Sequence, residues 1–410
     1  MQYDIMLQGF HWQAQSVKDR IGRSWYAIIK ENAQRIKDSG FTLVWFPPPS
    51  DSLAYEGYLP RKLDVLDSRY GTKSELKEAI AALGSVKVIA DIVVNHRVGT
   101  TGPADFKDPD WSRFTITAND EYTGRKSFNL DSGESYGPAR DLDHRNPETQ
   151  NGIITWMNSL KDLDTTDGKD VTGFKGWRYD LVKGFAGWAV ELYNERVETE
   201  FSVGEYFDYD PQKVVGWIDS THPNPAFRST AFDFPLRNVL YEAITKRKFH
   251  YLKYGDRAPG VIGLWSDKAV TFIENHDTED VRNSEYAPYF PGRSQMVQGY
   301  AYILTHPGIP CVFWGDIYDS GPLHEAEIRR LIEIRKRYRV HSESKLYIAA
   351  AQEGLVYAAY VQGDEGEIAM KIGPGSWQPS GGKWQTGPGA DLLISGPDYA
   401  VWGDRGRFWS

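Results

Sequence analysis

The chain has 410 residues, of which 40% are hydrophobic and 25% charged, which is the balance of an ordinary soluble globular protein. Its net charge of −9 and isoelectric point of about 5.6 argue against a nucleic-acid partner and are compatible with a neutral substrate or with bound cations. The length suits one large catalytic domain with one or two smaller modules.

Apolar runs that alternate with helix-like segments predict a parallel sheet covered by helices. The predicted strands are 3–8, 41–46, 86–94, 174–179, 201–205, 230–234, 269–274 and 310–314. The predicted helices are 24–39, 73–83, 147–163, 186–198, 211–220, 235–247, 293–305 and 323–338. Eight strands and eight helices in alternation predict an α/β fold of the (β/α)8 barrel (TIM barrel) type.

Two segments break the alternation. Residues 97–145 are polar and rich in Gly, Asp and Pro, which predicts an inserted subdomain after strand 3. Residues 341–410 contain short strand-like runs between glycine-rich turns, which predict a C-terminal antiparallel β domain. The barrel would then comprise residues 1–96 and 146–340.

The C-terminal segment is rich in tryptophan. Trp377, Trp384, Trp402 and Trp409 could either form the core of a small sheet or present a sugar-binding face. Packing is the favoured interpretation, because a small β module needs large side chains for its core.

The single cysteine, Cys311, excludes an intrachain disulfide and, among apolar neighbours, is expected to be a small buried hydrophobe. The start M-Q-Y-D-I-M has no basic region and no long apolar stretch, so no signal peptide or transmembrane helix is visible. We therefore expect a protein without membrane contact, which is either cytoplasmic or a secreted mature chain with an added start Met. We also expect a monomer.

The stretch from Gly173 to Gly184 carries the first chemical signal. Its predicted strand ends on Asp180, and the C-terminal ends of barrel strands are where such enzymes place their chemistry. Arg178 lies two residues earlier, on the same side of the strand, and is expected to lower the pKa of Asp180 and keep it ionised. The alternative is an ion pair with a structural role at a strand end.

Three other strand ends carry polar side chains, at Asn95-His96, at Glu205 and at Glu274 to Asp277. In a barrel these ends lie around one rim, so Asp180, Glu205 and Asp277 would share one pocket. Repulsion among carboxylates raises at least one pKa, which leaves a protonated acid beside an ionised nucleophile. This pair is typical of glycosidic bond cleavage with retention of configuration.

Four motifs carry a family resemblance. D-I-V-V-N-H, G-W-R-Y-D-L-V-K-G, G-E-Y-F and F-I-E-N-H-D-T resemble, in order and spacing, the signature regions of the α-amylase family, family 13 of the glycoside hydrolases. L-Q-G-F-H-W, W-F-P-P-P-S, E-G-Y-L-P and Q-G-Y-A-Y-I-L-T-H-P-G-I-P-C look like plant-type α-amylases. The resemblance covers nearly the whole chain.

The resemblance implies the catalytic roles. Asp180 matches the nucleophile, Glu205 the general acid/base, and Asp277 the carboxylate that stabilises the transition state. The implied reaction passes through a covalent glycosyl-enzyme and keeps the α configuration.

The resemblance also implies substrate contacts. His96 and His276 match histidines that bind hydroxyls of the cleaved sugar, and Tyr58 matches an aromatic residue that stacks on it. Arg178 matches the arginine that orients the nucleophile. Lys183 resembles a contact on the leaving-group side, although a solvated lysine at a helix start is an equally good interpretation.

Oxygen donors around the insertion suit calcium, which takes six to eight oxygens in irregular geometry. Taken alone, Asp131 and Asp141 could be turn residues, since Asp favours turns. The resemblance implies Ca2+ bound by the side chains of Asn95, Asp131 and Asp141 and by the carbonyls of Glu134 and Gly184, which would pin the insertion to the barrel.

Two positions depart from the plant pattern. Phe207 stands where plant enzymes commonly carry Trp, and it could still stack on a sugar on the leaving-group side. The segment after Asp277, T-E-D-V-R-N-S-E-Y, is also unlike them, which leaves the pocket rim and product lengths open.

The implied activity is an endo-acting α-amylase, an α-1,4-glucan hydrolase on starch, glycogen or maltooligosaccharides. An exo-acting maltooligosaccharide-forming enzyme and a transglycosylase remain alternatives in the same fold. A non-catalytic glucan-binding protein would be expected to have lost a catalytic carboxylate, and all three are present. A barrel enzyme on phosphorylated substrates would need a Gly-rich phosphate loop after strand 7 or 8, which is not visible.

Overall fold

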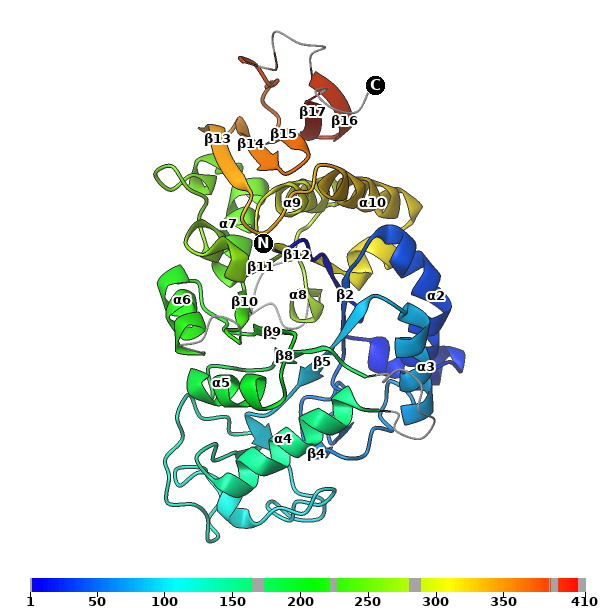
Figure 1. The fold of residues 1–410 in the computed structure, drawn as a ribbon, viewed down its shortest axis with the longest axis vertical. Coiled ribbons are helices and arrows are strands. Elements are labelled where there is room, and N and C mark those ends of the chain that lie inside the picture. The colour runs from blue at the N-terminus through cyan, green and yellow to red at the C-terminus, as the bar shows by residue number, and fades with distance from the viewer. Residues whose placement is uncertain are drawn as a thin grey trace.

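A closed barrel of eight parallel strands forms the centre of the molecule in a computed structural model, which describes residues 2–163, 173–221, 227–279, 289–382, 384 and 390–404 (Figure 1). Around the barrel the order is β1-β12-β11-β10-β9-β8-β5-β2. The strands are β1 (Met6–Gln8), β2 (Leu43–Phe46), β5 (Lys87–Ile92), β8 (Gly176–Tyr179), β9 (Phe201–Gly204), β10 (Thr230–Phe232), β11 (Ala269–Phe272) and β12 (Ile309–Phe313). The predicted barrel is confirmed, with strands shorter than their apolar runs.

The eight predicted helices are all present. They are α2 (Trp25–Ser39), α3 (Lys73–Leu83), α4 (Pro147–Lys161), α5 (Gly187–Arg196), α6 (Pro211–Ser220), α7 (Phe234–Thr245), α9 (Arg293–Thr305) and α10 (Pro322–Arg337). Local chemistry fixes their starts: Thr72 and Glu75 form a capping box at α3, and Asp210 accepts a hydrogen bond from the backbone N–H of Gln212 at α6.

Several short elements are not predicted by the sequence pattern, because a segment of only a few residues has no measurable period. Two are short helices, α1 (Val17–Ile21) and α8 (His276–Glu279). Another is the two-stranded sheet of β3 (Asp51–Ser52) and β4 (Pro60–Lys62). A π-helical turn, η7 (Gly315–Asp319), follows β12.

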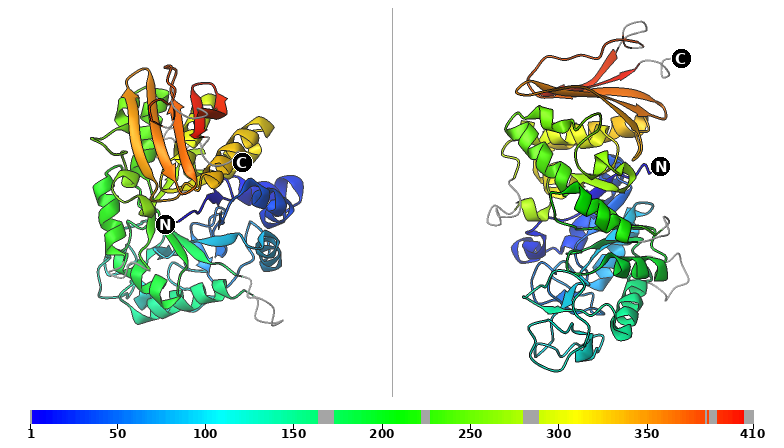
Figure 2. Two further views of the ribbon diagram at one scale, coloured as in Figure 1. Left: turned by 45° about the horizontal axis from the view of Figure 1, so that its top comes forward. Right: turned by 90° about the vertical axis from the view of Figure 1, so that its left-hand side faces the viewer.

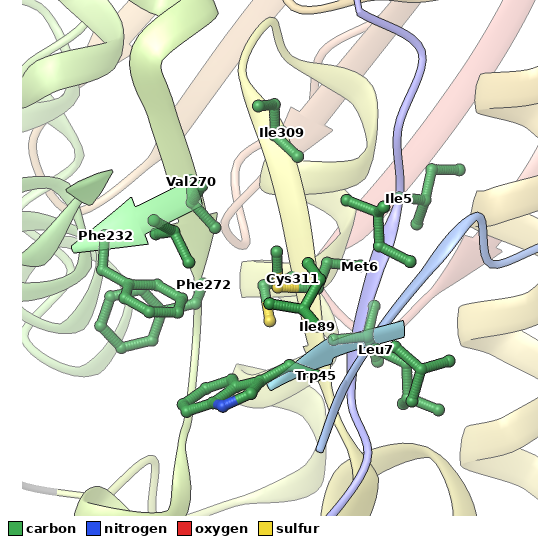
Figure 3. Packing of buried hydrophobic residues seen from close by; sticks show 14 of the residues in the cluster. Ile5, Met6, Leu7, Trp45, Ile89, Phe232, Val270, Phe272, Ile309 and Cys311 are labelled. Atoms are coloured by element: carbon green, nitrogen blue, oxygen red, sulfur yellow. The ribbon is translucent and has the colours of Figure 1, made fainter. Parts of the chain in front are cut away.

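The barrel interior is packed with side chains from all sides, as Figure 3 shows for Met6, Trp45, Ile89, Phe272 and Cys311. Cys311 is 2% exposed, which confirms that it is a small buried hydrophobe. Each such large side chain contributes about 1.5–3 kcal/mol on burial, so the interior forms a rigid base under the strand ends.

The insertion between β5 and α4 consists mostly of turns. Its edge is fixed by β6 (His96–Arg97), which pairs antiparallel with β7 (Arg140–Asp141). The buried guanidinium of Arg97 donates to the backbone carbonyls of Arg61, Lys107 and Pro109, so one side chain holds several turns against the barrel. Arg97 thus provides hydrogen bonds for buried backbone carbonyls that, in a helix or a sheet, would be paired with backbone N–H groups.

The C-terminal sheet forms a separate layer over α9 and α10 (Figure 2). Its strands are β13 (Lys345–Gln352), β14 (Val356–Gly363), β15 (Gly366–Ile372), β16 (Ala390–Gly396) and β17 (Tyr399–Asp404), in the antiparallel order β13-β14-β15-β17-β16. The predicted β module is confirmed, while the exact division of the chain into 1–96, 97–145, 146–340 and 341–410 stays a prediction.

The tryptophans of this sheet gather in a small cluster apart from the main core. Trp384 and Trp402 are buried there, and partly buried Trp377 and Tyr360 pack against them. Packing is therefore the better interpretation of Trp384 and Trp402. Trp409 lies outside the described residues. Across the described part of the chain, no helix has the length and apolar character that crossing a membrane requires.

Candidate active site

The C-terminal ends of the strands meet in one cavity of about 440 Å³. Asp180 follows β8, Glu205 follows β9, and Asp277 lies in α8 behind β11. The cavity is lined by Trp12, Tyr58, His96, Glu134, Tyr136, Asp180, Leu181, Lys183, Glu205, Phe207, Phe234, Asn275, His276, Asp277 and Thr278. The three predicted catalytic carboxylates are thus brought together, with five of the six predicted substrate contacts.

Arg178, the sixth, lies beneath the cavity and joins three carboxylates. Its Nη1 lies 2.9 Å from Oδ1 of Asp91 and 2.7 Å from Oδ1 of Asp180, and its Nη2 lies 2.8 Å from Oε1 of Glu205. In the barrel, Asp91 on β5 pairs in register with Arg178 on β8. Charge-assisted bonds in this buried setting fix the positions of both Asp180 and Glu205.

The electrostatic effect on Asp180 differs from the sequence expectation. Burial raises the pKa of Asp180 to about 6, because desolvation outweighs the lowering by Arg178, and Asp91 and Asp277 raise it further. The arginine therefore limits the rise rather than producing a net fall, and Asp180 is still ionised at pH 7.

Glu205 is shifted more strongly. Burial raises the pKa of Glu205 to about 8, with added repulsion from Asp180 and Asp277, while Arg178 and the backbone N–H of Leu181 oppose the rise. At pH 7 the site therefore holds a protonated Glu205 beside an ionised Asp180. One protonated and one ionised carboxyl group is the combination that the sequence predicted for this pair.

The hydrogen bonds around His276 define its tautomer. The Tyr58 hydroxyl donates to Oδ2 of Asp91 at 3.0 Å, so its one proton is used and it accepts from Nε2 of His276 at 2.7 Å. Nδ1 then accepts from the side-chain amide of Gln8 at 2.9 Å. Burial lowers the pKa of His276 to about 4, so the ring is neutral at pH 7.

Aromatic rings form one wall of the cavity. Trp12 and Tyr58 are stacked, with ring centroids 6.3 Å apart and planes 9° apart. Next to Tyr58, whose carbonyl lies 2.8 Å from Nε2 of His96, Tyr136 of the insertion stacks on His96 with centroids 4.1 Å apart. Flat faces of this kind suit the apolar faces of sugar rings.

The other wall carries Phe207 and Lys183. Phe207 packs edge-on against Phe234, with centroids 4.8 Å apart. The ammonium of Lys183 lies 3.2 Å from Oδ2 of Asp208 and 3.6 Å from Oε1 of Glu134. Lys183 is thus a paired lysine in the cavity wall, and its role as a contact on the leaving-group side stays a prediction.

The predicted calcium ligands lie beside this cavity, which one of them, Glu134, also lines, and their packing fits a cation. Within the described part of the chain, the buried Oδ2 of Asp131 has no hydrogen-bond partner. Burial raises the pKa of Asp131, and Asp120 adds to the rise while a hydrogen bond with Asp141 opposes it. Burial also raises the pKa of Asp141 to about 7, with added repulsion from Asp131 and Asp120. A divalent ion between the Asp131 and Asp141 carboxylates would offset the repulsion between their negative charges.

Backbone packing supports the same position. A Cβ added to Gly184 would lie 2.0 Å from Oδ1 of Asn95, so only glycine lets the chain approach this amide. The N–H of Glu134 donates to the carbonyl of Lys183 at 2.8 Å, which ties the insertion to the loop after Asp180. No group of three His, Cys, Asp or Glu occurs at metal-binding spacing among the described residues. The predicted set differs in kind, because it contains two carboxylates, one amide and two carbonyls.

Comparison with known proteins decides the family. The chain is 36% identical to the probable α-amylase 2 of Arabidopsis thaliana, over 97% of this chain and 94% of that protein. The chain belongs to the α-amylase family. It is also 35% identical to the chloroplastic α-amylase 3 of Arabidopsis thaliana, over 98% of this chain but 44% of that longer protein. Residues 337–403 match the α-amylase C-terminal β-sheet domain.

The α-amylase fold is confirmed independently by a solved structure. An α-amylase from Anoxybacillus superposes with a TM-score of 0.71 over 99% of both chains at 17% identity. The expected resemblance to plant-type α-amylases is confirmed by the Arabidopsis relatives.

Four residues of this α-amylase site were not identified as site residues from the sequence, namely Asp91, Gln8, Trp12 and Tyr136. Asp91 stands in the quoted motif D-I-V-V-N-H, and its place opposite Arg178 on the neighbouring strand was the signal that could have identified it. The other three lie in loops or at a strand end, where spacing does not predict which way a side chain faces.

Proposed function

We propose that this member of the α-amylase family is an endo-acting, retaining α-1,4-glucan hydrolase that cleaves starch, glycogen or maltooligosaccharides. The observation that carries the proposal is the guanidinium of Arg178, which binds Asp180 through one nitrogen and Glu205 through the other. Two carboxyl groups on one guanidinium are compatible with the short separation of about 5–5.5 Å that retaining glycosidases use.

The chemistry divides between two carboxyl groups. Glu205, protonated because its pKa is raised to about 8, donates its proton to the glycosidic oxygen as the bond to the leaving sugar breaks. Ionised Asp180 attacks the anomeric carbon and forms a covalent glycosyl-enzyme. Glu205, now a carboxylate, takes a proton from water, which displaces Asp180, so the product keeps the α configuration.

The surrounding residues hold the sugar and stabilise its developing positive charge. Asp277, partly exposed at the cavity wall, supplies a third negative charge. We assign hydroxyl contacts to neutral His276 and His96 and a stacking contact to Tyr58. Phe207 and Lys183, on the chain segments that follow Glu205 and Asp180, serve the leaving-group side.

Calcium belongs to the proposal as a structural ion. Asn95, Asp131, Asp141 and the carbonyls of Glu134 and Gly184 would hold it. When bound, it would offset the charge of the Asp131 and Asp141 carboxylates and fix the insertion against the loop that contains Lys183.

Two alternatives stay within the same site chemistry. An exo-acting maltooligosaccharide-forming enzyme or a transglycosylase would use the same carboxylates and differ in cavity rim and water access. A non-catalytic glucan-binding role is disfavoured, because Asp180, Glu205 and Asp277 are all present and converge.

A product profile tests the proposal. The purified protein is incubated with soluble starch and with maltoheptaose, and the anomer of fresh product is followed by proton NMR. A spread of α-configured maltooligosaccharides with rapid loss of starch–iodine colour supports an endo-acting retaining enzyme. One dominant short product would assign exo action, and β-configured product would contradict the double displacement.

A further inference from the structure

Directly after Phe207, and outside the lining of the cavity, the chain carries an acid that takes no part in the proposed chemistry. Asp208 comes three residues after Glu205, and its side chain is 14% exposed. Its Oδ2 lies 3.2 Å from the ammonium of Lys183 and 3.2 Å from that of Lys213 on α6. The carboxylate therefore lies between a lysine of the cavity wall and a lysine of the outer surface.

The position of Asp208 is itself fixed. Its Oδ1 accepts the backbone N–H of Asp210 at 2.9 Å, and Asp210 in turn caps the start of α6. The Asp210 N–H lowers the pKa of Asp208 most, and the two lysines add to this against the opposing effect of burial, so the pKa is about 2 and the carboxyl is ionised at neutral pH. One oxygen thus anchors the side chain to a helix start while the other faces the ammonium groups.

Lys183 depends on this anchor more than on its other carboxylate neighbour. Glu134 is 71% exposed and its Oε1 lies 3.6 Å from the ammonium, so solvent screens the attraction. Lys183 is 22% exposed, and its ammonium also lies 5.4 Å from the ring centroid of Tyr206. An ammonium has three donors, so one bond to Asp208 leaves others for a ligand.

We propose that Asp208 is a positioning residue that holds the Lys183 ammonium in the leaving-group wall, where it binds hydroxyls of the glucose units beyond the cleaved bond. The inference rests on the proposed glucan hydrolase function. A flexible lysine would lose several rotatable bonds on binding sugar, and the fixed carboxylate removes part of that cost before substrate arrives.

The test uses Asp208→Asn, because asparagine keeps the oxygen that accepts the Asp210 N–H but loses the charge that holds Lys183. Two substrates are compared: maltoheptaose, which places glucose units on the leaving-group side, and an aryl α-maltotrioside, whose leaving group is a phenol. We expect kcat/KM for maltoheptaose to fall about tenfold, mainly through KM. For the aryl substrate we expect a change of less than about threefold.

Lys213→Met is the matched control, since Lys213 contacts the same oxygen of Asp208 but is 60% exposed and outside the cavity. It should leave kcat/KM on both substrates within about twofold. Lys183→Met should reproduce the selective loss, and the double variant Asp208→Asn/Lys183→Met should lose no more than Lys183→Met alone.

Equal losses on both substrates, or fully additive losses in the double variant, would overturn the positioning role, as would an unchanged maltoheptaose KM in Asp208→Asn. Melting curves of all variants identify any that fail to fold, in which case Lys183→Met carries the comparison. If the parent enzyme cleaves neither substrate, the proposed hydrolase function fails instead.

Discussion

Nη1 of Arg178 lies 2.9 Å and 3.1 Å from the two oxygens of Asp91, a carboxylate that is completely buried beneath the cavity. Trp45 and Tyr58 also donate to Oδ2 of Asp91, at 3.2 Å and 3.0 Å. Asp91 therefore holds the arginine that in turn holds Asp180 and Glu205, without lining the cavity itself.

Asp91→Asn should change both stability and the acidic limb of the pH profile. Removing a buried negative charge beside Asp180 lets Asp180 ionise more easily, so the acidic limb of kcat/KM should move to lower pH. Replacing a charge-assisted contact with a neutral one should cost about 2–3 kcal/mol of unfolding free energy. Denaturant melts and a pH series measure the two effects, and an upward move of the acidic limb would contradict the assignment.

The parent enzyme should have a bell-shaped pH profile. Asp180 must be ionised, so kcat/KM should rise as the pH passes about 6, and Glu205 must be protonated, so it should fall as the pH passes about 8. The limbs report the coupled pair rather than isolated groups. Initial rates on maltoheptaose between pH 4 and 10 provide the measurement, and a profile that stays flat from 5 to 9 would remove the pair from its role.

Glu205→Gln should separate acid catalysis from nucleophilic attack. We expect turnover of soluble starch to fall about 10³-fold while maltoheptaose still binds, because no proton is available for the sugar leaving group. The first step with a dinitrophenyl α-maltotrioside should fall much less, since that group leaves without protonation. Asp180→Asn is the control and should lose both substrates. A Glu205→Gln enzyme with near-normal starch turnover would refute the assignment.

Chelation should destabilise the folded protein. An ion that binds only the folded state contributes about 2.7 kcal/mol at a hundredfold excess over its Kd, so EDTA should lower the melting temperature and added Ca2+ should restore it. Asp131→Asn should be less stable than the parent in Ca2+ and insensitive to EDTA. Asp110→Asn, an exposed acid of the same insertion, should respond to EDTA as the parent does. Identical melts with and without EDTA would count against the site.

The tryptophans of the C-terminal sheet should prove structural. Trp384 and Trp402 are buried in one cluster, so replacing either with Ala should lower the unfolding free energy by about 3–5 kcal/mol. Binding to granular starch should be unchanged at temperatures where the variant is folded. Tyr347→Ala, at an exposed ring of β13, is the control for stability. Loss of starch binding without loss of stability would favour the sugar-binding interpretation.

The barrel, the C-terminal sheet and the convergence of Asp180, Glu205 and Asp277 were predictable from the sequence, because hydrophobic period and strand order fix where strand ends meet. The pKa values of the buried carboxyl groups could not be predicted from the sequence in the same way. Burial raises the pKa of Asp180 despite Arg178, and desolvation depends on depth that a pattern does not contain.

The direction in which side chains point after a strand ends could not be predicted from the sequence either. Glu274 stands in the same motif as Asp277, yet it is buried in an ion pair with Arg237 of α7 at 2.9 Å, while Asp277 lines the cavity. Both follow β11, where the chain leaves the strand and enters the short helix α8, so the alternation of a strand no longer predicts which way each residue points.

The seam of the barrel joins distant parts of the chain. Met6 of β1 pairs with Cys311 of β12, and Leu7 pairs with Val312, so the circle of strands closes between segments about 300 residues apart. During synthesis, the edge of β1 that pairs with β12 therefore stays unpaired until β12 has left the ribosome. Because His276 depends on Gln8 at the end of β1, the cavity acquires its final hydrogen bonds only after this closure. Catalytic competence should consequently appear late in folding, as a single event tied to the last strand rather than gradually as the chain grows.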